Sequence, residues 1–386
     1  MNVQIKPSNI KLTFKLCCFI LLILICIACN SSQNPKLKDV YKNAFYIGVA
    51  LNHDQIFGND SNSVAIVEEQ FNSITPENIL KWESVHPGPE KYDFEPADRY
   101  VALGEKNHMF IVGHTLVWHH QTPEWVFKDE SGSLTDRETL LQRMREHILT
   151  VVSRYKGRIH GWDVVNEAIT DDGQFRKNKW LEIIGEDYVL KAFEYAHEAD
   201  PNAELYYNDY NMWKQGQRRG VVRLIRNLQS KGIRVDGVGI QGHWGMDYPP
   251  IDELEASILA FSELGVKVMI TELDITVLPA AWDYEGADIS LNFEMQKELN
   301  PYPDALPDTV QNKLANRYAE LFLLFHKHSD KISRVTFWGV HDGQSFRNYW
   351  PVEGRTDYPL LFDRQYQPKP AFDAVVRTVR NKEYKT

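Results

Sequence analysis

Residues 159–167 read IHGWDVVNE, a short apolar run that ends in an amide and a carboxylate. A second run of the same kind covers residues 267–272, KVMITE, and also ends in a glutamate. Short runs rich in β-branched and aromatic residues are typical of buried strands. Both runs are therefore predicted to be strands, and each carries a polar side chain at its carboxyl end.

Six more runs of this kind occur along the chain, and longer amphipathic segments separate them. The further strands are expected at residues 45–50, 71–75, 110–114, 204–208, 237–241 and 334–338. Helix-like patterns cover residues 140–155, 180–199, 217–231, 251–264 and 309–327. Short strands that alternate with helices favour a parallel sheet. Eight such units in one undivided span, residues 41–380, favour a single closed (β/α)8 TIM barrel over an open doubly wound sheet.

Residues of the kinds found in catalytic sites end most of the predicted strands. They are Glu77-Asn78, His114, Asn166-Glu167, Asn208-Asp209, Gln241-Gly242-His243, Glu272 and Trp338. The carboxyl ends of barrel strands meet at one mouth, where the active sites of this fold lie. The sequence therefore predicts an active site at that mouth.

Glu167 and Glu272 end the fourth and seventh predicted strands, which lie opposite each other in a narrow barrel. Two facing carboxylates are what glycoside hydrolysis requires, because one protonates the departing oxygen while the other attacks or stabilises the anomeric carbon. Two alternatives stay open at this point. Each glutamate alone could be a salt-bridge partner or a helix cap, and the pair could serve an unrelated isomerase.

Two histidine groups, His119-His120 and His326-Lys327-His328, raise the question of a metal site. Adjacent histidines point in opposite directions on a strand, and an i, i+2 pair diverges on a helix. The sequence contains no helical H-E-x-x-H pattern. These histidines are therefore interpreted as surface or packing residues, and we expect neither a metal nor a cofactor.

The overall charge and the cysteines exclude other classes. The 386 residues carry a formal net charge of -10, which argues against a nucleic-acid partner. All four cysteines, at positions 17, 18, 26 and 29, lie near the N-terminus. The rest of the chain therefore has no disulfide and no cysteine zinc site.

The N-terminus is basic, at Lys6, Lys11 and Lys15, and an apolar run over residues 16–28 follows. This pattern predicts a secretory signal peptide, residues 1–28, which is too short for a comfortable membrane span. Ile27-Ala28-Cys29 resembles the lipobox of bacterial lipoproteins, although Cys26 stands where leucine is usual. The resemblance implies lipidation of Cys29, a tether over residues 29–40, and an exported protein anchored to a membrane at the cell surface or in the periplasm. The alternative is a plain cleaved signal peptide.

From residue 45 to about residue 372, the chain resembles glycoside hydrolase family 10, the β-1,4-xylanases. The segments that carry the resemblance are FNSITPEN (71–78) with Lys81-Trp82, GHTLVW (113–118), WDVVNE (162–167), YNDYN (207–211), GIQGH (239–243), ITELD (270–274) and TFWGV (336–340). The resemblance implies a cofactor-independent, monomeric barrel enzyme that hydrolyses internal β-1,4-xylosidic linkages in xylan.

The resemblance also implies a role for each matching residue. Glu272 would be the nucleophile and Glu167 the general acid/base of a retaining double displacement, with their carboxyl groups about 5–5.5 Å apart. His243 and Asp274 would support the nucleophile, and Asn166 would contact the reacting sugar. The expected substrate-binding residues are Glu77, Asn78, Lys81, His114, Trp118, Gln241, Trp338 and Phe346.

Two features of the sequence bear on which substrate the site accepts. Phe346 stands where the family usually has a tryptophan that covers the reacting sugar. Residues 278–307 are long for one barrel loop, and long loops at the catalytic face often shape specificity. A related barrel β-1,4-glucanase and a non-catalytic surface glycan-binding lipoprotein stay open as alternatives.

Overall fold

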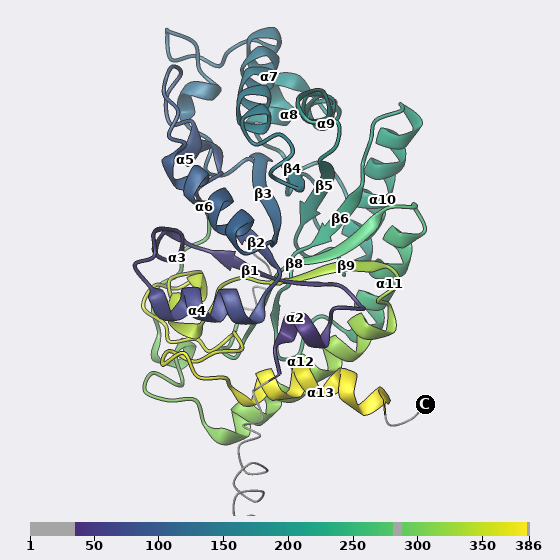
Figure 1. Ribbon diagram of the computed structural model, residues 1–386. Helices are drawn as coiled ribbons and strands as arrows, with labels where there is room; N and C mark the ends of the chain where they lie inside the picture. The colour runs from purple at the N-terminus through teal and green to yellow at the C-terminus, as the bar shows by residue number, and fades with distance from the viewer. Residues whose placement is uncertain (1–34, 281–287, 384–386) are drawn as a thin grey trace, which may run out of the picture. The chain divides into compact units, whose positions relative to one another are not determined.

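The computed structural model describes residues 35–280 and 288–383. Within them, eight parallel strands close into a barrel (Figure 1), as the sequence predicts. Neighbouring strands in the chain pair with each other, and the ring closes where β1 pairs with β9 and β6 pairs with β8. The barrel strands are β1 (Tyr46–Leu51), β2 (Ser73–Pro76), β3 (Phe110–Val117), β4 (Gly161–Asn166), β5 (Glu204–Asp209), β6 (Gly237–Ile240), β8 (Lys267–Thr276) and β9 (Ile332–Phe337).

The short strand β7 (His243–Gly245) begins a few residues after β6 and pairs with the far end of β8. Its register sets His243 directly beside Asp274. The strand β8 is long enough to serve both partners, first β6 and then β7. The carboxyl end of β8 therefore extends past the barrel wall, toward the mouth where the active site is expected.

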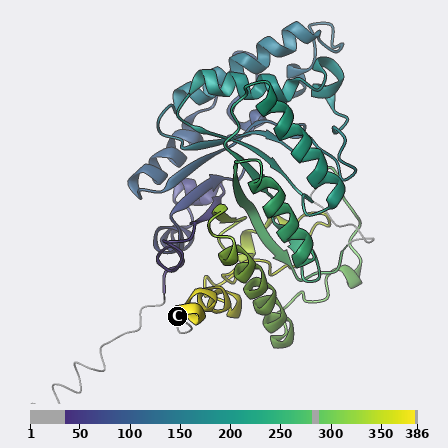
Figure 2. The same cartoon turned by 90° about the vertical axis from the view of Figure 1, so that its right-hand side faces the viewer.

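Helices form a layer around the outer face of the strands (Figures 1 and 2). The α-helices are α2 (Leu37–Val40), α3 (His53–Phe57), α4 (Ser61–Gln70), α5 (Trp82–Val85), α6 (Glu95–Lys106), α7 (Arg137–Arg154), α8 (Lys179–Ile184), α9 (Tyr188–Ala199), α10 (Gln215–Ser230), α11 (Ile251–Ser262), α12 (Asp308–Lys327) and α13 (Pro370–Glu383). Short 3-10 helices are η1 (Glu124–Val126), η3 (Lys297–Leu299), η4 (Asp342–Gln344) and η5 (Phe346–Asn348).

The single helix expected over residues 180–199 is wrong, because two helices occupy this span. Gly185 ends α8 with a φ of 92°, a backbone conformation that favours glycine. The chain then turns and starts α9 at Tyr188. An amphipathic pattern can continue across such a turn, so the pattern alone did not reveal the break.

The folded unit includes part of the segment that the sequence assigned to a tether. Residues 37–40 form α2, and the Leu37 side chain is fully buried. The Leu37 backbone N–H donates a hydrogen bond to Gln70 Oε1 at 3.1 Å. The predicted signal peptide and Cys29 lie outside the described residues. Among the residues that are described, no helix is both long and apolar enough to cross a membrane.

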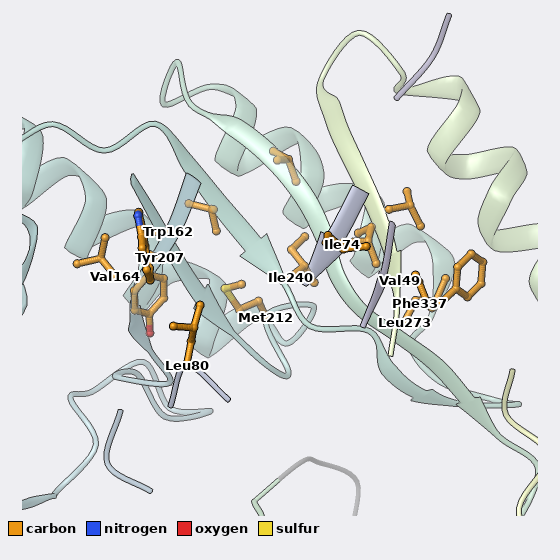
Figure 3. Close-up of a cluster of buried hydrophobic side chains, with 14 of the residues drawn as sticks. Val49, Ile74, Leu80, Trp162, Val164, Tyr207, Met212, Ile240, Leu273 and Phe337 are labelled. Carbon is orange, nitrogen blue, oxygen red and sulfur yellow. The ribbon is translucent and has the colours of Figure 1, made fainter. Parts of the chain in front are cut away.

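One continuous apolar core joins the barrel strands to the helices, and Figure 3 shows part of it. Trp162 on β4 illustrates how tightly it is packed, because a Cβ at Gly113 on the neighbouring strand would lie 2.1 Å from the indole. On β8, Leu273 is part of this core. Side chains alternate along a strand, so Glu272 and Asp274 on either side of Leu273 point the other way. The core thus fixes the direction in which these two carboxylates face.

Candidate active site

A cavity of about 180 Å³ lies at the carboxyl ends of the barrel strands. It gathers side chains from segments far apart in the sequence, as expected for the mouth of a barrel. Its lining residues are Glu77, Asn78, Lys81, His114, Trp118, Gln121, Asn166, Glu167, Gln241, His243, Glu272, Ile289, Trp338 and Phe346. Every site residue expected from the sequence within the described part of the chain lines this cavity except Asp274. That carboxylate is buried behind His243.

Glu272 stands on β8 with both carboxylate oxygens engaged. His243 Nε2 lies 3.0 Å from Oε2, and Asn208 Nδ2 donates to Oε1 at 2.8 Å. The residue is 4% exposed. A carboxylate that accepts bonds on both oxygens is held in one orientation, which a nucleophile requires.

Glu167 follows β4 directly and has a φ of 59°, in the left-handed region. Such a conformation costs a non-glycine residue on the order of 1 kcal/mol and persists only where surrounding bonds enforce it. Here the backbone is held at both ends. The Glu167 N–H donates to Asn208 O at 2.9 Å, and Arg176 Nε donates to Glu167 O at 3.0 Å. This turn carries the side chain off the strand direction and into the cavity.

The Glu167 carboxylate is held by three donors. Trp118 Nε1 donates to Oε2 at 2.8 Å, while Gln241 Nε2 and Asn166 Nδ2 donate to Oε1 at 3.1 and 3.2 Å. The same Gln241 nitrogen also lies 3.2 Å from Asn166 Oδ1. Trp118 follows β3, Asn166 ends β4 and Gln241 follows β6, so the positions of these donors depend on several strands of the barrel.

Asn208 connects the two glutamates and was not singled out as a site residue from the sequence. The parallel register sets Asn208 on β5 beside Asn166 on β4, and Asn208 Nδ2 donates to Asn166 Oδ1 at 2.9 Å. The same nitrogen reaches Glu272, and Thr271 Oγ1 donates to Asn208 Oδ1 at 2.6 Å. The amides therefore form one network that runs from one carboxylate to the other. Only the strand-end position of Asn208 hinted at this in the sequence.

The two carboxyl groups have pKa values displaced in opposite directions. Burial, with a contribution from the Glu272 charge, raises the pKa of Glu167 above its usual range. Burial also pushes the pKa of Glu272 upward, but His243, His114 and the Asn208 amide outweigh it and lower that pKa. The pair is thus biased toward a proton on Glu167 and a charge on Glu272. Such separation identifies an acid and a base or nucleophile in many enzymes.

His243 carries a positive charge at neutral pH. Burial alone would lower its pKa, but the charges and hydrogen bonds of Asp274 and Glu272 raise the pKa of His243 to about 9. Its Nδ1 lies 3.1 Å from Asp274 Oδ2. As an imidazolium, the ring donates from both nitrogens, one to each carboxylate.

The rest of the cavity offers hydroxyl-binding groups and aromatic faces. Lys81 Nζ donates to Asn78 Oδ1 and to Gln121 Oε1, each at 2.8 Å, and lies 4.9 Å from the centre of the Trp118 ring. Its burial lowers the pKa of Lys81, while burial raises the pKa of Glu77. Polar groups set among aromatic side chains are typical of sites that bind sugars.

Trp338 and Phe346 pack against the histidines of the site. Trp338 lies edge-on to His114 and to His243, with ring centroids 5.5 and 6.0 Å apart. Phe346 lies edge-on to His243 at 4.9 Å and stacks on Trp350 at 5.6 Å. Both aromatic residues line the cavity.

Two lining residues, Gln121 and Ile289, were missed from the sequence. Ile289 belongs to the long loop over residues 278–307, and beside it Asp288 Oδ1 lies 3.4 Å from His120 Nε2. This loop therefore reaches the segment after β3. Gln121 and Ile289 stand outside regular strands, so no periodicity marked either. In the described residues, no group of three or more histidine, cysteine or acidic side chains is placed to hold a metal ion.

Comparisons with known proteins agree with this geometry. A family model described as Glycosyl hydrolase family 10 matches residues 36–378. Endo-1,4-beta-xylanase A of Xylanibacter ruminicola is 46% identical over 356 residues, which cover 92% of this chain and 96% of that protein. Beta-1,4-xylanase of Dictyoglomus thermophilum is 42% identical over 345 residues, which cover 89% and 91%. A solved family 10 endoxylanase from a sugarcane soil metagenome is 46% identical with a TM-score of 0.86, and the match covers 88% of this chain and 99% of that one.

Proposed function

Because this chain belongs to glycosyl hydrolase family 10, we propose that it is an endo-1,4-β-xylanase that cleaves xylan through Glu167 and Glu272. The observation that carries the proposal is the pair of buried glutamates with oppositely displaced pKa values in a cavity of sugar-binding character. Relatives that match over nearly their whole length are named endo-1,4-β-xylanases. They supply the substrate class that the chemistry alone leaves open.

The proposed mechanism is a retaining double displacement. The Glu272 carboxylate attacks the anomeric carbon, and Glu167 gives its proton to the departing oxygen as the glycosidic bond breaks. Glu167, now ionised, takes a proton from water, whose oxygen attacks the same carbon and frees Glu272. The two steps together return Glu167 and Glu272 to their starting states, so no cofactor is consumed. The amide network keeps both carboxylates in place through the two steps.

The most direct test is the product pattern from several xylans over time. We expect early release of oligosaccharides of mixed length, because an endo-acting enzyme cuts within the chain. Initial rates on xylan should exceed those on soluble cellulose, whose sugars carry a hydroxymethyl group that must fit near Phe346. Higher rates on the glucan would refute the substrate assignment. Xylan binding without new reducing ends would instead indicate a non-catalytic glycan-binding protein.

The dependence of kcat/KM on pH should be bell-shaped. Attack requires an ionised Glu272, so activity falls as the pH drops through the lowered pKa of Glu272. Protonation of the leaving group requires a protonated Glu167, so activity falls as the pH rises through the raised pKa of Glu167. We therefore expect an acid limb below the usual glutamate range and a basic limb above it, measured on a soluble xylo-oligosaccharide. The matched control is an aryl xylobioside with a good leaving group, which needs no proton and should show a weaker basic limb. An unchanged basic limb would contradict the role of Glu167.

We also propose that Cys29 is lipidated and anchors the enzyme to a membrane after export. Support comes from the basic start, the apolar run and the Ile27-Ala28-Cys29 sequence. The wild-type protein should incorporate radiolabelled fatty acid and sediment with membranes, whereas Cys29→Ser should do neither. Replacement of the neighbouring Cys26 by leucine is the control and should preserve both. Equal labelling of Cys29→Ser would refute the assignment.

A further inference from the structure

Arg347 contacts the site from behind, through a carboxylate that does not line the cavity. It lies in η5, directly after Phe346, and is 3% exposed. Its Nε and Nη2 donate to Asp274 Oδ1 at 3.0 and 2.9 Å. Asp274 is fully buried, and its other oxygen, Oδ2, faces His243 Nδ1. Because His243 Nε2 faces Glu272 at 3.0 Å, four side chains form one continuous hydrogen-bonded line.

We propose that Arg347 is a positioning residue for the nucleophile, acting through Asp274 and His243 to fix the Glu272 carboxylate for attack. The inference rests on the proposed function, since it takes Glu272 as the nucleophile. It adds to the site a residue that would never touch the substrate. No sequence pattern singles out Arg347, because it lies outside the strand ends at which the site residues are predicted.

Charge balance explains why such a residue is needed. Asp274 and Glu272 are two buried carboxylates that share one imidazolium, His243. A buried charge without a counter-charge is costly, so one cation between two carboxylates leaves the group one negative charge in excess. An arginine stays protonated at any ordinary pH and binds a carboxylate with two parallel donors. Arg347 thus neutralises the line and leaves the imidazolium to serve Glu272.

Geometry points the same way. Arg347 occupies Asp274 Oδ1 with two donors, so Asp274 can offer only Oδ2 to His243. That contact keeps a proton on Nδ1 and sets the plane of the ring, and the ring then presents Nε2–H to Glu272. Burial pushes the pKa of Asp274 upward, but Arg347 and His243 outweigh it and lower that pKa. Asp274 therefore remains a charged acceptor.

A plain packing role is the competing explanation. The Arg347 guanidinium lies 5.5 Å from the centre of the Phe346 ring, so it could simply hold that side chain over the cavity. Loss of packing would raise KM or reduce the number of folded sites. It would not change the pH at which Glu272 gains a proton. The pH profile therefore separates the two roles.

Other charged or titratable groups surround the hydrogen-bonded series from Arg347 to Glu272, and they are the same in the wild type and in the Arg347 variants. On the Glu272 side they are His114, Glu167, Glu77 and Lys81, and on the Arg347 side they are Tyr248, Tyr318, Arg355 and Asp357. Arg355 offers a matched control. It is 5% exposed, and its hydrogen bonds go to the backbone oxygens of Pro279 and Trp350 rather than to Asp274.

The test compares Arg347→Gln, Arg347→Lys and the control Arg355→Gln with the wild type. Active sites are first counted with an activated 2-deoxy-2-fluoro xylobioside, which releases one leaving group as it traps each nucleophile. The pH profile of kcat/KM is then measured per active site. Arg347→Gln should move the acid limb upward by about one pH unit, because Glu272 loses support for its charge. Arg347→Lys should restore much of the shift, and Arg355→Gln should leave the limb in place.

An acid limb in Arg347→Gln that matches the wild type, per trapped site, would overturn the proposal. So would a failure of Arg347→Gln to fold, measured by circular dichroism, while Arg347→Lys and Arg355→Gln fold normally, since the role would then be in folding. Mass spectrometry of the trapped wild type keeps the two hypotheses apart. A label on a residue other than Glu272 would refute the proposed function itself, and a label on Glu272 leaves the Arg347 comparison decisive.

Discussion

Glu272→Ala is expected to lower kcat on xylan by on the order of 10⁵-fold, which is the scale seen when a covalent nucleophile is removed. Without the Glu272 carboxylate, no glycosyl-enzyme can form. Reducing-end release from soluble xylan measures the loss. Thermal unfolding must be followed in parallel, because removal of Glu272 leaves His243 and Asn208 without their shared acceptor.

A small anion can test the assignment further. Azide that enters the space left in Glu272→Ala should attack an aryl xylobioside from the face that Glu272 normally occupies. The product would be a glycosyl azide of inverted, α configuration, identified by NMR. The isosteric Glu272→Gln is the matched control, because it is equally inactive but leaves no space for azide. A Glu272→Ala protein that is folded and retains wild-type turnover would show that the nucleophile lies elsewhere.

Sequence patterns predicted the barrel strands well because each strand is marked by its own short run of residues. A buried parallel strand needs a short run of β-branched and aromatic residues, and eight such runs can be recognised without knowing what they contact. The site was predicted for a related reason, since the strand ends of a barrel meet at one mouth. Glu167 and Glu272 could therefore be paired from their strand positions alone.

The parts that escaped the sequence depend on register or on loop conformation. Asn208 was visible as a strand-end amide, but its contact with both Asn166 and Glu272 follows from how β4, β5 and β8 are aligned. Ile289 lies in the loop after β8, and Arg347 lies in the three-residue helix η5 after β9; neither segment is long enough or regular enough for a periodic pattern to reveal the side-chain direction. The break between α8 and α9 depends on the positive φ of one residue, Gly185, while the amphipathic pattern continues across it.

Glu167→Ala is expected to have an effect that depends on the leaving group. On xylan, whose leaving oxygen needs a proton, kcat/KM should fall by about 10³-fold, within the range that general acid catalysis supplies. On an aryl xylobioside with a very good leaving group, bond cleavage should be nearly unchanged. Release of the glycosyl-enzyme should still be slow, since Glu167 also activates the water. The first turnover should therefore appear as a burst in a stopped-flow assay.

Azide distinguishes Glu167 from Glu272 by stereochemistry. In Glu167→Ala, azide replaces water in the second step, so the glycosyl azide should keep the β configuration, opposite to that from Glu272→Ala. Asn166→Ala is the matched control, because it removes a neighbouring contact to the same carboxylate without removing a proton donor, and azide should not accelerate it. A uniform loss on xylan and on the aryl substrate would mean that Glu167 binds sugar rather than transferring a proton. The dependence on leaving group is thus the feature that separates an acid catalyst from a binding residue in this cavity.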